Sequence, residues 1–218
     1  MIHKRAPAAI LTLAALFAAA PALAHPHIFI DARAELVFDG DGRIVSVRHI
    51  WQFDSAWSAY AVQGLDADGN GFLSTAELQP MAELNVTSVA EYGYFTSLTI
   101  GGVSAAFVPP TEYFLDIYGT QLVLFFTLPL DIPRAPAGVV ELQVYDPEYY
   151  VAFDFDPAQP MLLVDAPAGC MARFEAAAEP DDATAAILAL IPADQRALPT
   201  ELASVTGDLA NTITVACS

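Results

Sequence analysis

The sequence has few basic residues and a large excess of acidic ones. It contains eight Lys and Arg against 26 Asp and Glu, a formal net charge of −18. If Lys4 and Arg5 are left out, six arginines and no lysine remain. The rest of the chain then has a formal net charge of −20. An acidic surface repels nucleic acid and anionic lipid, and it concentrates cations. We therefore expect no nucleic-acid partner.

Long apolar runs are also rare. The one substantial run, residues 8–20, follows two basic residues and precedes the motif Ala22-Leu23-Ala24, as in a secretory signal peptide. This run is shorter than the roughly 20 apolar residues that a membrane-spanning helix needs. We expect residues 1–24 to be a signal peptide that is cleaved after Ala24. Residues 25–218 would then be periplasmic or secreted, without stable membrane insertion.

Cysteine is nearly absent, because Cys170 and Cys217 are the only two. In an oxidising compartment an even pair is expected to form a disulfide. The alternative, a metal site built on two thiols, would need more sulfur or histidine nearby. The sequence therefore favours a disulfide that ties the C-terminal segment to the rest of the chain.

The motifs of several common enzyme classes are missing as well. The chain has no Ser-His-Asp order, no Cys–His nucleophile pair, no phosphate-binding loop and no zinc-protease signature. We therefore do not expect an enzyme, with one exception that depends on the N-terminal histidines.

Residues 66–77 match a twelve-residue EF-hand calcium loop at its key positions. Gly71 stands where that loop makes its sharp turn. The run Asp-Gly-Asn-Gly also occurs in ordinary turns, but a glycine and a final glutamate in register favour Ca²⁺. The residues that would supply oxygen to the ion are Asp66, Asp68, Asn70, Phe72 through its carbonyl, Ser74 and Glu77.

Apolar residues alternate with polar ones on both sides of this loop, which predicts many short strands. Residues 39–42, Asp-Gly-Asp-Gly, predict a hairpin turn between two of them. Helices are expected over 55–65, 75–92 and near 182–190. The further strands are expected at 28–30, 34–38, 44–53, 95–100, 103–108, 113–118, 122–128, 139–145, 151–155, 161–164 and 212–215.

These elements predict an α+β fold that is mostly antiparallel β, as a sandwich or barrel-like sheet. The helix-loop-helix of the EF-hand, about 55–92, would be inserted in it. We expect residues 25–218 to form a single β-rich domain.

Cleavage after Ala24 would make His25 the new N-terminal residue. On an extended chain His25 and His27 point to the same side, about 6–7 Å apart. Imidazole suits Ni²⁺, Co²⁺, Zn²⁺ or Cu²⁺ better than Ca²⁺, and Asp31 is the third candidate ligand. The alternative is that these polar residues simply lie at a frayed terminus.

His49, Asp54 and Asp146 are further polar residues that could join a site. A hairpin turn centred on residues 40–41 places His49 opposite Ala32, roughly 16 Å along the strand from His27. We expect His49 to pack in the core or to make a single hydrogen bond. Asp54 is better placed than His49 to join a metal site with the N-terminal histidines. Asp146 belongs to an Asp-Pro turn.

Five segments occur together in this chain: HPHIFID at 25–31, WQFD at 51–54, YGYFT at 92–96, YDPEYYVAF at 145–153 and APAGC at 166–170. Their combination resembles the DUF1007 family of exported bacterial proteins, which are described as periplasmic components of an uncharacterised transport system. The resemblance implies an accessory role beside an inner-membrane transporter of the nickel/cobalt type. The His-Pro-His start of that family corresponds to His25 and His27.

Three functions are consistent with these features. The first is a calcium-binding periplasmic accessory protein that captures a transition metal at His25 and His27. The second is a protein-interaction module stabilised by calcium, with no transition-metal role. The third is a copper oxidoreductase in which His25, its free amine and His27 hold the copper.

Overall fold

The computed structural model describes residues 26–192, 198 and 209–217. The predicted signal peptide and His25 lie outside these residues. The described part consists of β1 (Ile28–Phe38), β2 (Ile44–Phe53), α1 (Ser55–Ala61), α2 (Thr75–Ser88), the 3₁₀ helix η1 (Ala90–Phe95), β3 (Thr96–Ile100), β4 (Val103–Ser104), β5 (Glu112–Tyr118), β6 (Gln121–Arg134), β7 (Val139–Val144), β8 (Val151–Phe155), β9 (Met161–Val164), β10 (Met171–Glu175), α3 (Asp182–Leu188) and β11 (Asn211–Ala216).

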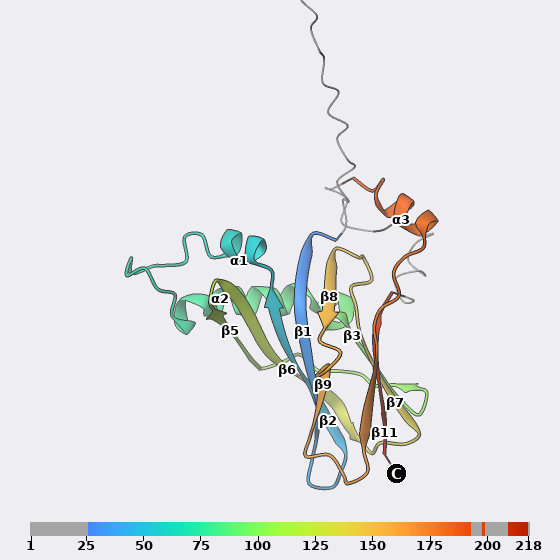
Figure 1. Ribbon diagram of the computed structural model, residues 1–218. Coiled ribbons are helices and arrows are strands. Elements are labelled where there is room, and N and C mark those ends of the chain that lie inside the picture. Colours follow the sequence, from blue (N-terminus) through green and yellow to red (C-terminus); the bar gives the residue numbers. More distant parts are fainter. Residues whose placement is uncertain (1–25, 193–197, 199–208, 218) are drawn as a thin grey trace, which may run out of the picture.

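The strands form two sheets, and the expected mostly antiparallel α+β fold is confirmed (Figure 1). The first sheet has the order β5-β6-β2-β1-β8, and β9 also pairs with β1. The second sheet has the order β10-β11-β7-β3-β4. The strand pairs are antiparallel except that β1 runs parallel to both β8 and β9, a pairing that the sequence did not predict.

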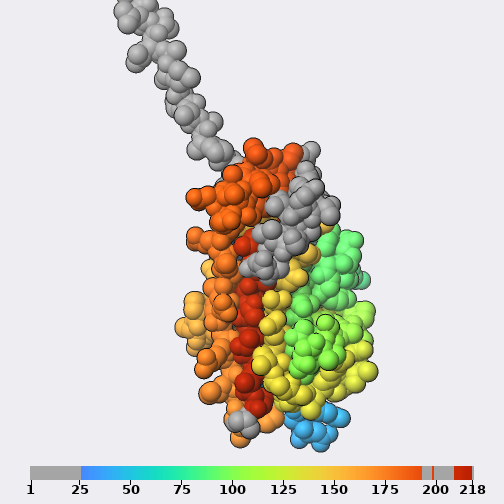
Figure 2. All heavy atoms as spheres, turned by 90° about the vertical axis from the view of Figure 1, so that its right-hand side faces the viewer, coloured from blue at the N-terminus to red at the C-terminus, as the bar shows by residue number. Residues whose placement is uncertain are grey.

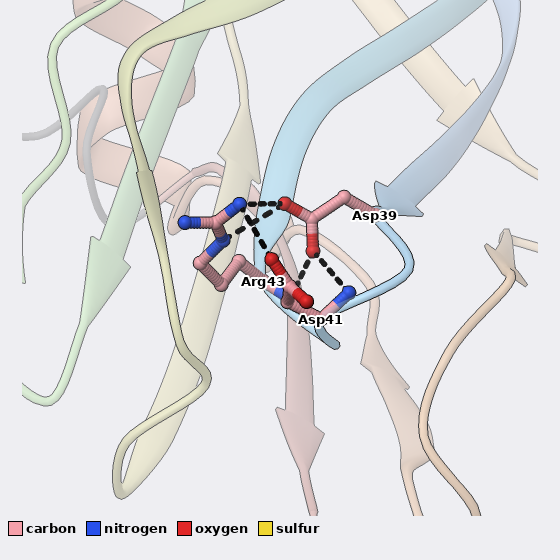
Figure 3. Close-up of polar contacts among 3 residues, drawn as sticks. All are labelled: Asp39, Asp41 and Arg43. Carbon is pink, nitrogen blue, oxygen red and sulfur yellow. Dashed lines mark hydrogen bonds and ion pairs between the residues drawn. The ribbon is translucent and has the colours of Figure 1, made fainter.

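A hairpin turn joins β1 to β2 at the place that the sequence predicted (Figure 3). The Asp39 carboxylate accepts hydrogen bonds from the backbone N–H groups of Asp41 and Arg43, at 3.0 and 2.9 Å. The Arg43 guanidinium pairs with Asp39 at 2.8 Å and with Asp41 at 3.0 Å. Gly42 has φ 74°, a conformation that most side chains disfavour. These local contacts fix where the chain reverses.

Inward-facing residues of both sheets and of α2 form one continuous hydrophobic core. Strand β1 shows why, since its burial alternates along the strand and places every second residue inside. Helix α2 adds Leu78, Ala82 and Val86, which are four residues apart and therefore lie on one face. No helix among the described residues is both long and apolar enough to span a membrane.

Cys170 and Cys217 form the predicted disulfide. The bond connects the start of β10 to the end of β11, two strands that pair from Met171↔Ala216 onward. Figure 2 shows β11 running between β10 on one side and β7 on the other. The sequence missed β10, because this strand lies at a sheet edge and most of its side chains are exposed.

Two predicted helices are shorter than expected. Helix α1 ends at Ala61 instead of reaching residue 65, and Gly64 follows with φ 78°. Helix α2 ends at Ser88, and the segment predicted to continue it becomes η1, which is interrupted by a left-handed Gly93. A glycine with positive φ follows α1 and another interrupts η1, so neither helix continues as far as predicted.

Candidate functional site

The acidic loop, residues 66–77, projects away from the two sheets between α1 and α2 (Figure 1). Its last residues enter α2 through a capping box, in which the Ser74 side chain accepts from the Glu77 N–H and the Glu77 side chain accepts from the Ser74 N–H. Its first residue is separated from α1 by the turn of residues 62–65. The loop therefore runs directly into the outgoing helix, whereas a turn separates it from the incoming one.

Three predicted oxygen ligands converge in this loop. Asp66, Asp68 and Glu77 each offer a carboxylate oxygen, and these oxygens all lie within 4.8 Å of one another. In the described part of the chain this is the one group of three or more His, Cys, Asp or Glu residues with such spacing. Three carboxylates at this separation form a hard-oxygen donor set of the kind that Ca²⁺ prefers.

Backbone N–H groups hold two of these carboxylates in place. The N–H of Asn70 donates to Asp66 Oδ1 and to Asp68 Oδ1, both at 3.1 Å, and the N–H of Gly71 donates to Asp66 Oδ2 at 2.9 Å. Gly71 has φ 84°, as the sharp turn at this position requires. The chain therefore wraps around the Asp66 side chain before any ion contributes.

Hydrogen bonds also fix the Glu77 carboxylate. It accepts from the Ser74 N–H at 2.8 Å, from the Ser74 hydroxyl at 2.7 Å and from the Ala67 N–H at 2.9 Å. The bonds from Ser74, followed by the one from Ala67, stabilise the charged form and lower the pKa of Glu77 to about 2. Glu77 thus links the beginning of the loop to its end, and it is ionised at neutral pH.

The other residues predicted to supply oxygen to the ion also lie within the loop. The Asn70 amide donates to Asp68 Oδ2 at 2.7 Å, and its Oδ1 accepts from the Phe72 N–H at the same distance. The Phe72 side chain is largely exposed, whereas Leu73 packs against the core. The donor set therefore fits Ca²⁺, with Leu73 attaching the loop to the body of the protein.

The predicted transition-metal residues are only partly described. The backbone N–H of His27 donates to the Tyr150 carbonyl at 2.8 Å, and the two rings lie 4.8 Å apart. Asp31 is exposed on the outer face of the first sheet, opposite Asp154 of β8. His25 lies outside the described residues, so a site made of His25, His27 and Asp31 stays a prediction.

His49 packs in the core, as the sequence predicted. It is 1% exposed, its ring stacks on Phe126 at 4.8 Å, and its Nε2 lies 3.1 Å from the Thr96 hydroxyl. Burial lowers the pKa of His49 to about 3, so the ring is neutral. The predicted strand register was wrong, because His49 of β2 lies opposite Ala34 of β1 and not opposite Ala32. The turn is wider than assumed, and the register shifts before β2 reaches residue 46.

The carboxylates of Asp54 and Asp146 both accept hydrogen bonds from backbone N–H groups. Asp54 caps α1 by accepting from the Ala56 and Trp57 N–H groups, and its other oxygen accepts from the Phe29 N–H at 3.1 Å. Asp146 is buried, and it accepts from three backbone N–H groups that follow it, those of Glu148, Tyr150 and Val151. These bonds support the interpretation of residues 146–150 as a turn.

A second feature, which the sequence analysis missed, is an aromatic cavity of about 380 Å³. Its walls come from β1, β2, α1, the end of α2, η1, β6, the turn before β8 and the first residue of β8. The aromatic residues and acids of WQFD, YGYFT and YDPEYY were visible in the sequence. Nothing in their spacing shows that three segments so far apart enclose one space.

Comparison with known proteins supplies a family. The sequence model described as "Protein of unknown function (DUF1007)" matches residues 10–217. An uncharacterised protein of Haemophilus influenzae is 27% identical over 146 residues, which cover 66% of this chain and 68% of that protein.

Proposed function

Since this chain belongs to the DUF1007 family of unknown function, we propose from its own geometry that it is an exported calcium-binding protein. We further propose that it acts as an accessory component of a transition-metal transport system. The observation that carries the calcium proposal is the convergence of Asp66, Asp68 and Glu77 within 4.8 Å. The proposed role in transition-metal transport rests on His25 and His27 and on the acidic character of the chain.

The role of calcium in this proposal is structural. The loop connects α2, whose inner face is buried in the core, to the short helix α1. Three carboxylates so close together repel one another, and a divalent cation would remove that repulsion. Loops of this kind in extracellular modules bind with Kd values of about 10⁻⁴–10⁻³ M. An exported protein would meet calcium in that range.

Calcium should therefore stabilise the wild-type protein, and Asp66→Ala should abolish the effect. For a Kd of about 10⁻⁴–10⁻³ M, roughly 10 mM calcium adds about 1.4–2.7 kcal/mol to the free energy of unfolding. Urea titrations with calcium and with chelator measure this difference for each variant. Asp66 is the better choice than Glu77, because Glu77 also caps α2.

Asp131→Ala is the matched control, since Asp131 is also an exposed aspartate but lies on β6, away from the loop. This variant should retain the full calcium effect. The proposal that the loop binds calcium would be abandoned if calcium stabilised the wild type and Asp66→Ala equally, or if it stabilised neither.

The transition-metal role has a separate test. In saturating calcium, the protein without residues 1–24 should bind Ni²⁺, Co²⁺, Zn²⁺ or Cu²⁺ with a Kd of about 10⁻⁶ M or lower, through its imidazoles. The double variant His25→Ala, His27→Ala should lose this binding, and His49→Gln should not, since His49 is buried. Calorimetric titration measures both. Equal binding by the double variant would leave a calcium-stabilised interaction module as the function.

A further inference from the structure

The aromatic cavity has a composition that selects for a particular ligand chemistry. Its volume of about 380 Å³ lies within the range of small-molecule sites, roughly 300–1,000 Å³. Three of its lining residues are acidic, and neither Lys nor Arg is among the described residues that line it. Six of the others are aromatic: Trp51, Phe53, Trp57, Tyr92, Phe95 and Tyr150.

The acidic residues make the cavity electronegative. Glu91 is exposed and Glu148 is half-buried, and both stand beside Tyr92. Burial, followed by the negative charges of Glu148 and Glu91, raises the pKa of Tyr92. Asp146 adds a third carboxylate, which the backbone holds in position. An anionic ligand would therefore be repelled here, and a cation would be attracted.

The aromatic wall is held in an unusual backbone conformation. Phe95, which lines the cavity, has φ 53°, and its neighbour Tyr94 has φ 58°. Tyr149, which precedes the lining residue Tyr150, has φ 56°. Residues other than glycine rarely adopt these angles, and they do so where the surrounding structure forces them, often at ligand-binding walls. The surrounding fold therefore holds the backbone that carries Phe95 and the backbone next to Tyr150.

We propose that this cavity binds a small organic cation of the quaternary ammonium type. Aromatic faces attract cations through the ring quadrupole, and they favour weakly hydrated cations that carry apolar groups. Metal ions such as Ca²⁺ prefer a shell of converging oxygen atoms, and the three acidic residues of this cavity do not converge as those of the acidic loop do. This site shares no residue with the acidic loop, so it is independent of the calcium proposal.

Tryptophan fluorescence tests the proposal directly, because the chain has two tryptophans and both Trp51 and Trp57 line the cavity. The protein is titrated with choline and, separately, with dimethylbutanol, the neutral carbon isostere of choline. Calcium is kept constant and saturating. Choline should shift or quench the emission with saturation, and it should bind about tenfold more tightly than the isostere.

Two variants locate the binding. Glu148→Gln removes one charge and should weaken choline binding about fivefold, and Tyr92→Leu removes one ring and should weaken it about tenfold. Glu83→Gln is the control, since Glu83 is exposed on α2 outside the cavity and should leave the affinity unchanged. Denaturant unfolding of each variant verifies that it is folded.

The proposal is overturned by any of three results. These are no saturable fluorescence change with choline, equal affinity for choline and dimethylbutanol, or equal weakening by Glu83→Gln and Glu148→Gln. None of these three results bears on calcium binding by the acidic loop. The cavity proposal can therefore fail while the calcium proposal stands, and the reverse also holds.

Discussion

Replacing Cys170 and Cys217 together by alanine is expected to lower the free energy of unfolding by about 3–4 kcal/mol. The two residues are 47 positions apart, and the bond between them restricts the unfolded chain over that whole length. In the folded protein the same bond closes the end of the β10–β11 pair, whose strands already lie side by side. The native state therefore gains little new order from it, and the main effect falls on the unfolded state.

Urea unfolding of the oxidised wild type, the reduced wild type and the double-alanine variant measures this loss. The reduced protein and the variant should agree, because both lack the covalent link. Amide exchange should also become faster in β10, an edge strand that pairs with β11 alone. A difference below about 1 kcal/mol would contradict the prediction, because the bond would then restrict the unfolded chain little.

Acidification is expected to destabilise the protein through His49. The pKa of this buried histidine is about 3, against 6.5 for the exposed side chain. Between these two values the unfolded chain binds a proton that the folded protein does not bind. The stability that comes from the neutral ring is therefore complete above pH 6.5 and declines as the pH falls toward 3, by about 1.4 kcal/mol per pH unit in the steep part.

His49→Gln separates this effect from the titration of carboxylates. Between pH 6 and pH 4, the free energy of unfolding of the wild type should fall by roughly 2–3 kcal/mol more than that of the variant. Glutamine is a suitable replacement because it does not titrate and can still reach the Thr96 hydroxyl. Urea titrations at each pH provide the numbers. Parallel curves, or an NMR titration of His49 near pH 6.5, would contradict the prediction.

The features that the sequence predicted correctly depend on residues close together in the chain. The hairpin at 39–42 follows from an aspartate whose carboxylate reaches N–H groups two and four residues ahead. The predicted start of α2 at Thr75 follows from Ser74, whose side chain accepts from the N–H of Glu77, three residues ahead. Such contacts form wherever the local sequence allows them, so spacing alone is sufficient to predict them.

Long-range pairing could not be obtained in this way. The parallel partners of β1 lie more than a hundred residues later, and their apolar residues would suit an antiparallel neighbour equally well. The position of His49 shows how small the deciding difference is, since a wider turn and a register shift moved its partner from Ala32 to Ala34. Register depends on how whole strands bury their apolar faces against each other.

The aromatic cavity illustrates the same division. Its composition is written in the sequence as separate groups of aromatic and acidic residues, and each group is equally consistent with a strand edge or a turn. Their meeting depends on β1, β2, η1 and the turn before β8 being brought together by the shared core. Local chemistry thus specifies the caps of helices, the turns and the conformation of the acidic loop, whereas burial of apolar surface over the whole chain specifies which segments become neighbours.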